Sequence, residues 1–457
     1  MRLTERGRER ATLESRNVFA ACVRKAVFAG AALMTMVALP SVAQAACEIP
    51  EDYRDPFATG ANGRLNLIDK PLKGTYDALN RAGIDVGGAY VAEPFYNWGG
   101  LKDGGQYNGV LELYMNADMK KLGLWDGLCF HVNGYQIHGN SISGVNVGSL
   151  MPVTSFEADP ATRLFELWFE QFLFNDRVSV RFGQLAADEE FYAADGGGFF
   201  INGTWGWSPL PAENLPGGGP AYPIATPGVR VALAPTDDTS VLIGVFNGNP
   251  APDCPADDAQ ACNPDGLDFG LRDNALLMVE GAYSYSVGGG TLPGTIKLGG
   301  WNHFGDADDL ITGRPKESEY ALYIILDQLL WQAPDGEEGQ GIGFFTRFTG
   351  APDSISFVDF YFDVGLTFTG MIPGRPDDAL AVGYAYTGIS SNAQTASVND
   401  GGVKGNGYEG LIEVAYTMEV IDGWTLQPDF QYFFNPGAGF DGADDAAVVG
   451  ARSTFAF

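Results

Sequence analysis

Between residues 163 and 185 the sequence places polar side chains at alternate positions, and these side chains have the chemistry to bind a hydroxyl-rich solute. Carboxylates accept hydrogen bonds from hydroxyl groups, a guanidinium donates them, and an indole ring stacks against apolar C–H faces. The residues concerned are Glu166, Trp168, Glu170 and Arg181. The alternative is that the arginine and the glutamates only neutralise one another within a protein wall, because buried charges usually pair.

A second group of candidates lies in the long segment 185–227, which carries more aromatic rings than a solvated surface loop should. Tyr192, Trp205 and Trp207 belong to it. If the segment folds inward, these rings leave water, and an indole can then stack on the apolar face of a ring-shaped solute. The alternative is that the rings only anchor the segment to a protein wall.

The element that would position such groups is clearest at residues 358–369, which read VDFYFDVGLTFT. Large apolar residues alternate with polar or small ones, and a period of two predicts a β-strand with one apolar and one polar face. The apolar face is uniformly large, and the other face carries two aspartates. We therefore expect lipid on one side of this strand and water on the other.

The same alternation predicts sixteen strands, joined by connections that are short and long in turn. The strands are expected at 87–98, 109–119, 128–136, 164–173, 178–184, 228–234, 239–247, 275–286, 294–302, 320–331, 341–349, 358–369, 379–387, 408–418, 426–434 and 446–457. Such a pattern is typical of a single closed antiparallel transmembrane β-barrel with short periplasmic turns and long extracellular loops. The segment 185–227 is the loop expected to fold into the lumen.

On this barrel, additional polar residues should point inward and line a water-filled channel. The alternation selects Asp359, Asp363, Glu413, Gln427, Asp429 and Arg452. Binding in a channel has to be weak, or the solute would not leave.

Composition excludes several classes of protein. The net charge is −30, and residues 1–45 carry seven Arg/Lys and three Glu, so the remainder has a net charge of −34. Such a surface repels nucleic acid. Beyond residue 45 no apolar run reaches the roughly 18–20 residues that a membrane helix needs. With 18% charged residues, 12% aromatic residues and 62 glycines, the composition suits many strands joined by turns.

The N-terminal region predicts export from the cytoplasm. Arg24 and Lys25 precede an apolar run at 26–39, and an Ala-Gln-Ala site ends at Ala45. These features are typical of a Sec-type signal peptide over residues 1–45. We expect a periplasmic segment with a short helix at 46–85 and the barrel at 86–457. The last strand ends on Phe457, which resembles the signal that outer-membrane barrels present to their assembly machinery.

Four cysteines follow the leader, and export permits disulfides. Cys254 and Cys262 flank a polar loop, so a local bridge between them is the preferred pairing, although four cysteines allow three connectivities. No His or Cys spacing indicates a metal site. Because nucleophile-elbow and dinucleotide motifs are absent, we predict neither an enzyme nor a cofactor.

Several strings resemble the carbohydrate-selective porin family of the OprB type. They are GIDVGGAYV at 83–91, RLFELWFEQFLFNDRVSVRFGQL at 163–185, FINGTWGWSP at 200–209, IKLGGWNHFG at 296–305 and YEGLIEVAYTMEVIDGWTLQPDFQYFFNPG at 408–437. The resemblance implies a sixteen-stranded barrel in the outer membrane of a Gram-negative bacterium, passing monosaccharides such as glucose by passive diffusion. It also implies a monomer or weak homo-oligomer in contact with outer-membrane lipid and lipopolysaccharide.

The sequence therefore predicts an outer-membrane porin that admits small carbohydrates. One alternative is a general, weakly cation-preferring diffusion porin, which the negative charge favours. The other is a secreted β-sheet carbohydrate-binding protein.

Overall fold

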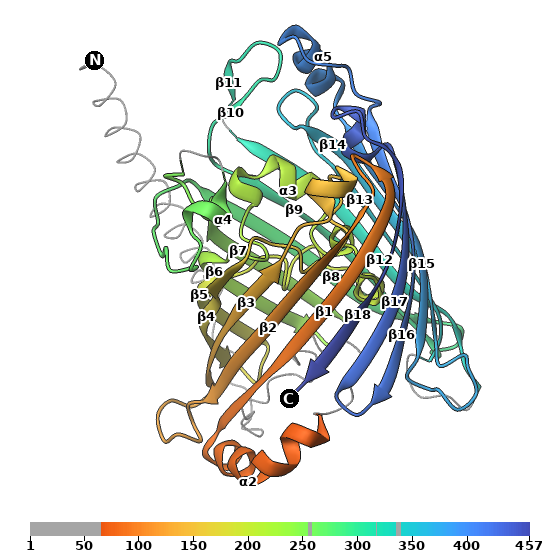
Figure 1. The fold of residues 1–457 in the computed structure, drawn as a ribbon. Helices are drawn as coiled ribbons and strands as arrows, with labels where there is room; N and C mark the ends of the chain where they lie inside the picture. The colour runs from red at the N-terminus through yellow and green to blue at the C-terminus, as the bar shows by residue number, and fades with distance from the viewer. Residues whose placement is uncertain (1–64, 255–257, 317, 335–339) are drawn as a thin grey trace.

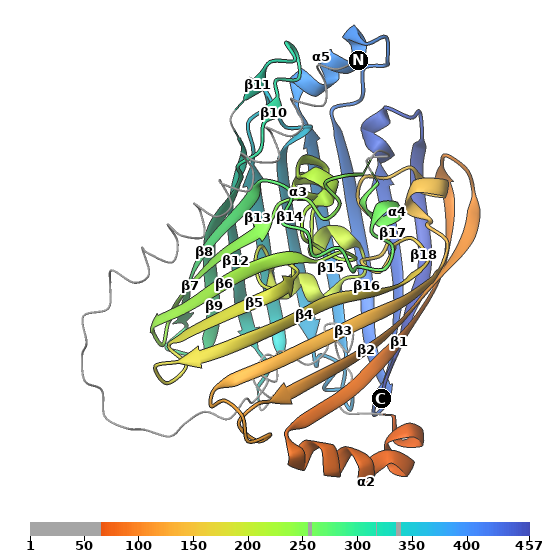
Figure 2. The same cartoon turned by 90° about the vertical axis from the view of Figure 1, so that its left-hand side faces the viewer.

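In the computed structural model, sixteen antiparallel strands close into one barrel (Figure 1; Figure 2). The structure describes residues 65–254, 258–316, 318–334 and 340–457. Each barrel strand pairs with its neighbours along the chain, and the first strand pairs with the last. Closure leaves no strand edge exposed, which is what a sheet inside a bilayer requires.

The barrel strands are β1 Ile84–Gly100, β2 Gly104–Asp118, β3 Leu128–Gly139, β4 Ala161–Leu173, β5 Val178–Leu185, β6 Thr226–Thr236, β7 Thr239–Asn247, β8 Ala275–Val287, β9 Leu292–His303, β12 Glu319–Gln332, β13 Gly341–Gly350, β14 Val358–Thr369, β15 Ala379–Ile389, β16 Tyr408–Ile421, β17 Trp424–Phe434 and β18 Asp444–Ala456. A small hairpin, β10 Ala307–Asp308 and β11 Pro315–Lys316, lies in the connection between β9 and β12.

The helices are α2 Asn66–Ala82, α3 Pro209–Asn214, α4 Ala259–Cys262 and α5 Ser391–Asn399, with shorter turns η3 Ser143–Val147, η4 Asp195–Phe199, η5 Gly203–Trp205, η6 Pro216–Gly218 and η7 Pro436–Gly439. Among the described residues, no helix has the length and hydrophobicity needed to cross a bilayer. All sixteen predicted barrel strands are confirmed, whereas the prediction did not include the β10–β11 hairpin or the helices within the loops.

The outer surface of the barrel is apolar and the inner surface polar, as β14 shows. Phe360 and Leu366 are 40% and 37% exposed, whereas Asp363, on the opposite face, is fully buried. The cross-strand partner of Asp363 is Arg347, so opposite charges lie next to each other on the inner face. An apolar outer face excludes the alternative of a secreted soluble β-protein.

The predicted alternation is wrong at one place in β4. Alternation with Leu167 and Phe169 would place Phe165 on the lipid face, but its side chain is fully buried and packs against Tyr135, with ring centroids 5.1 Å apart. The pairing of β3 with β4 shifts register between Val132 and Gly134. An extra residue at such a break turns the following side chains to the other face.

A second break affects Asp359. The register of β14 against β15 shifts between Val358 and Phe360. Val358 is consequently fully buried, and its backbone exchanges hydrogen bonds with the side chain of Asn214 in α3. Asp359, which was expected to line the lumen, is only half-buried.

The two ends of the described chain meet at one end of the barrel, where α2 also lies (Figure 1). Gly83 ends α2 in the left-handed conformation, with φ of 90°, which glycine adopts without steric cost. The backbone amide of Leu65 donates to Ala456 O at 2.8 Å, and Gly88 and Phe457 exchange two backbone hydrogen bonds of 2.9 Å. The division at residues 45 and 85 remains a prediction, and residues 1–64 lie outside the described part.

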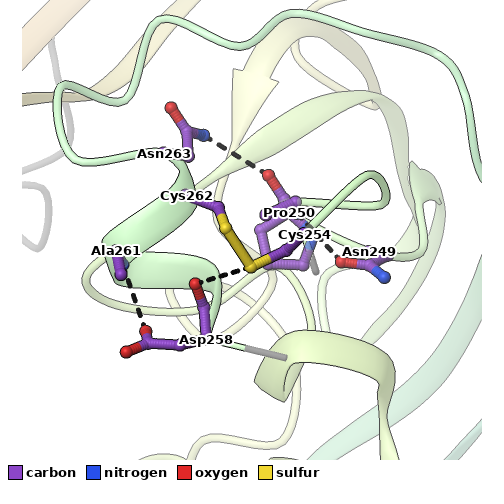
Figure 3. Close-up of a disulfide and its surroundings, with 8 residues drawn as sticks. Asn249, Pro250, Cys254, Asp258, Ala261, Cys262 and Asn263 are labelled. Carbon is purple, nitrogen blue, oxygen red and sulfur yellow. Dashed lines mark hydrogen bonds between the residues drawn. A yellow bond between two sulfur atoms is a disulfide. The ribbon is translucent and has the colours of Figure 1, made fainter. Parts of the chain in front are cut away.

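The predicted Cys254–Cys262 disulfide is present in the loop between β7 and β8 (Figure 3). Cys129 is also disulfide-bonded, and Cys47 lies outside the described residues. The stapled loop reaches back over the barrel rim: Asp265 O accepts from Leu164 N at 3.0 Å, and Gly266 O accepts from the amide of Gln184 at 3.0 Å.

Candidate functional site

Two connections fold into the barrel and bind its inner wall. One joins β3 to β4 (residues 140–160), and the other joins β5 to β6 (residues 186–225). In both overall views, α3 and the turns around it lie within the ring of strands (Figure 1; Figure 2). We call residues 186–207 the inner belt. It contacts the wall through its backbone and through side chains such as Glu190. The infolded 140–160 segment was not part of the prediction.

Wall carboxylates hold the belt by accepting hydrogen bonds from its backbone amides. Because an amide inside a barrel has lost its water, an ionised acceptor satisfies it well. The pairs are Glu166 with Ala186 N (2.9 Å), Glu280 with Tyr192 N (3.0 Å), Asp327 with Gly196 N (2.9 Å) and Glu413 with Ile201 N (2.6 Å). These acceptors come from β4, β8, β12 and β16, so the belt follows the wall around much of the barrel.

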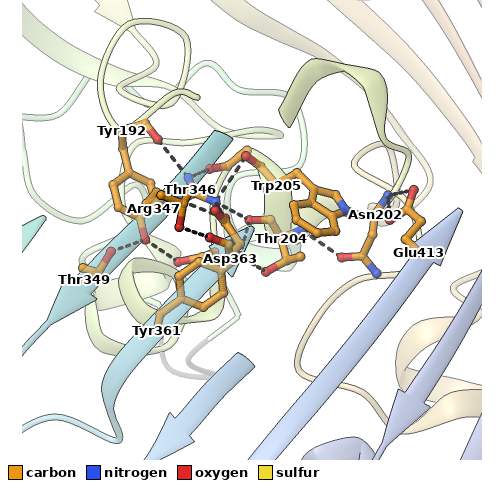
Figure 4. A network of polar contacts seen from close by, with 12 residues as sticks. Tyr192, Asn202, Thr204, Trp205, Thr346, Arg347, Thr349, Tyr361, Asp363 and Glu413 are labelled. Carbon is orange, nitrogen blue, oxygen red and sulfur yellow. Dashed lines mark hydrogen bonds and ion pairs between the residues drawn. The ribbon is translucent and has the colours of Figure 1, made fainter. Parts of the chain in front are cut away.

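Wall donors bind the belt's carbonyl groups, and Arg347 on β13 is the main one (Figure 4). Its guanidinium donates to the carbonyl oxygens of Tyr192, Thr204 and Gly206, each at 2.8 Å. It also pairs with Asp363 at 2.6 Å, and neither side chain is exposed. A fork of five donors suits this arrangement, because one group can hold two stretches of backbone together.

Lys297 and Gln427 add two further anchors. The ammonium of Lys297 donates to Ala193 O at 2.8 Å, and the amide of Gln427 donates to Phe199 O at 3.0 Å. Wall acceptors therefore bind the belt's amides and wall donors bind its carbonyl groups. Both kinds of backbone group hold the belt in place.

The predicted group on β4 and β5 forms a compact charge cluster. Arg181 pairs with Glu170 at 2.8 Å and with Glu190 of the belt at 2.5 Å, and Arg230 on β6 pairs with the same two carboxylates. Trp168 lies 3.9 Å below the guanidinium of Arg181. Its indole N–H donates to Glu166, so the four predicted residues lie together with two that were not predicted.

The three aromatic candidates of the belt differ in what they can offer a solute. Tyr192 is fully buried, and Trp205 is 2% exposed, with its N–H bonded to Glu413 and its ring stacked on Phe200 at 4.2 Å. Trp207 is partly exposed, and its N–H donates to Gly218 O at 3.0 Å. Of the three, Trp207 is the ring with surface left for stacking.

The remaining predicted residues bind the 140–160 segment or each other. Arg452 pairs with Glu93 at 2.5 Å and donates to the hydroxyls of Thr154 and Ser155 at 3.0 Å. Asp429 accepts from the amide of Gln431 at 2.8 Å, and Gln431 in turn donates to Val153 O. Glu409, which was not predicted, accepts from the amides of Leu150, Met151 and Gly437.

Sequence reasoning missed Arg347, Glu280, Asp327, Lys297, Arg230 and Glu409. Each lies on the inward-facing side of a correctly predicted strand, and all except Lys297 are buried. The signal was present at Arg347, which alternates with Thr346 and Phe348 in the strand 341–349. The partners could not be foreseen, because Glu413 and Ile201 are 212 positions apart.

The belt's carboxyls predict a pH-dependent ion preference. Burial raises the pKa of Asp188 to about 6, and burial together with the charge of Asp188 raises that of Glu189 well above its usual range. Asp188 therefore loses its charge as the pH falls through about 6. We expect the K⁺/Cl⁻ permeability ratio, from reversal potentials in planar bilayers, to fall between pH 7.5 and 5.

The double variant D188N/E189Q should start from a lower ratio and lose part of this change. D77N, in α2 outside the barrel, should behave like the wild type. A double variant that keeps the full pH response would contradict the assignment.

A closed barrel of sixteen strands, apolar outside and polar inside, with two connections folded into it, defines an outer-membrane channel protein. Residues 102–457 match the model of the carbohydrate-selective porin, OprB family. The chain belongs to this family, and its place is the outer membrane of a Gram-negative bacterium.

Individual relatives agree with this assignment. The chain is 24% identical to Porin B of Pseudomonas aeruginosa over 412 residues, covering 82% of this chain and 87% of that protein. Its fold is similar to that of OprB from Pseudomonas putida in a high-pH structure, with a TM-score of 0.73, 22% identity, and coverage of 87% and 99% of the two chains. The low-pH structure of the same protein gives a TM-score of 0.55 at 19% identity.

Proposed function

We propose that the protein passes neutral monosaccharides of about the size of glucose by passive diffusion. The observation that carries this is the inner belt, which lies against a polar wall and is bound to it by backbone hydrogen bonds and by the ion pairs of Glu190 with Arg181 and Arg230. A constriction whose charges are largely compensated presents hydrogen-bonding groups without a strong preference for ions. Within it, Trp207 supplies a partly exposed ring.

Liposome swelling tests this proposal. Proteoliposomes in isotonic glucose should swell faster than those in amino acids of similar size, because only the sugar offers many hydroxyl groups together with an apolar ring face. Equal rates would remove the claim of sugar selectivity and leave a general porin.

A second candidate function is general diffusion with a weak cation preference. The net charge of −34 beyond residue 45 favours it. Under this alternative, K⁺ selectivity would be marked and added glucose would not alter the single-channel current, whereas a sugar-binding constriction predicts a partial, reversible block.

The proposal has further parts. The long connections face the outside of the cell and the short turns the periplasm, as in other barrels of this type. Phe457 is the terminal residue recognised during assembly, the barrel is surrounded by outer-membrane lipid and lipopolysaccharide, and it works as a monomer or weak homo-oligomer. Transport is its activity, without catalysis or cofactor.

A further inference from the structure

Three consecutive glycines lie in the η4 turn of the belt, and packing requires only the first two. A Cβ atom on Gly196 would lie 2.3 Å from the Phe345 ring, and one on Gly197 would lie 2.9 Å from Trp205 O. Neither distance is compatible with a side chain, because both neighbours are themselves fixed in the barrel interior. Glycine at these two positions is therefore explained by the fold.

Gly198 has no such explanation. A Cβ atom there would meet no heavy atom within 4 Å, and the residue is exposed. Its φ is not in the left-handed region that favours glycine. Glycine in a helical turn costs conformational entropy without a gain in packing. The turn is nevertheless firmly held, since Asp327 accepts from Gly196 N and Gln427 donates to Phe199 O.

Gly206 repeats the pattern a few residues later. The nearest atom to its Cβ position is Gly203 O at 3.8 Å, and it too is exposed. Its carbonyl oxygen accepts from Arg347, so its position is fixed from the wall side. The contact of Gly197 with Trp205 joins the two stretches of the belt. Both exposed glycines thus lie on an anchored segment inside the barrel, facing open space.

We infer that Gly198 and Gly206 form the edge of the channel's aperture and determine the largest solute that passes. The absence of a side chain at these positions leaves the opening wide enough for a sugar ring. Because passage through a narrow pore depends steeply on its free radius, each added carbon should reduce permeation. This inference rests on the proposed function, since it names the specificity-determining residues of the same channel.

A graded series at Gly198 tests the inference in the full-length protein. The substitutions G198A, G198L and G198W should lower KCl conductance and glucose-driven swelling progressively, with the largest loss in G198W. The matched control is G350W, because Gly350 on β13 is exposed beside the outward-facing Phe348 and likewise has nothing within 4 Å of its Cβ position. G350W should conduct like the wild type.

A cysteine variant decides the question if G198W does not fold. G198C changes little before assembly, and a bulky methanethiosulfonate reagent then adds the obstruction to the finished channel. Conductance should fall on modification and recover with a reductant, with wild-type protein given both reagents as the control for Cys254–Cys262. Unchanged conductance in folded G198W, or in G198C whose modification is verified by mass, overturns the inference.

The test of the proposed function can be distinguished from the test of the aperture. If wild-type proteoliposomes do not admit glucose, the sugar-channel proposal fails, whereas the KCl conductance of the Gly198 series still tests the aperture. If glucose enters but the series has no effect, the function stands and the aperture lies elsewhere.

Discussion

Replacing Arg347 with methionine should release the inner belt and raise the single-channel conductance, more than any other single change to the lumen. The substitution removes the donor to four belt carbonyl groups and leaves Asp363 buried without its counter-charge. Breaking a buried ion pair in this way costs about 3–5 kcal/mol. The belt should detach locally from β13, because the other wall strands still hold their own segments of it.

Planar-bilayer recordings and swelling assays measure the effect. We expect larger and noisier current steps, and swelling rates for disaccharides that approach those for glucose. The double variant R347M/D363L should keep the raised conductance while regaining thermal stability, since it leaves no unpaired charge. R177M, which removes an arginine 47% exposed at a short turn, is the matched control. Wild-type conductance in folded R347M would contradict the proposal that Arg347 holds the inner belt in place.

A charge on the lipid-facing surface should have the second large effect, on assembly. Phe362 lies at the middle of β14, pointing outward, and its ring stacks with Phe348 and Tyr386 at 5.8 and 5.6 Å. An arginine near the centre of the apolar band costs about 2–4 kcal/mol. F362R should therefore lower the yield of folded barrel in the outer membrane and its melting temperature.

The measurement is the heat-dependent mobility shift of membrane fractions on detergent gels. The control is V398R, since Val398 is 49% exposed on α5 in a loop, where an added arginine stays in water. If F362R assembles as well as V398R, the outer face of β14 does not meet hydrocarbon.

The strands were predictable because a membrane barrel makes each strand obey the same local rule. Every second side chain faces lipid, so the alternation at 358–369 is enough to predict that strand without knowledge of its neighbours. The rule failed at Phe165 and Asp359, where the ladder shifts register. At Phe165 the nearby irregularity includes a hydrogen bond from Glu166 N to the Asn133 side chain, a contact between strands that alternation within one strand cannot contain.

For the candidate lumen residues, the inward orientation was predictable from the sequence, but their partners were not. Alternation identified Glu166, Glu413 and Asp363 as inward-facing, but it could not show that they accept hydrogen bonds from the belt or pair with Arg347. These contacts depend on the path of a connection without periodicity. The glycines of η4 illustrate the limit of sequence-based prediction. The sequence shows three identical residues, and only the packing around them distinguishes Gly198.

The meeting of the first and last strands imposes an order on biogenesis. β1 pairs with β18 along this seam, so the barrel can close only after the last strand has crossed the inner membrane. The segment around Thr154 bridges that seam through Glu93 and Arg452. The contacts of Thr154 with both edge strands can therefore form only as the wall closes, and a chain without β18 would leave β1 and β17 as open edges.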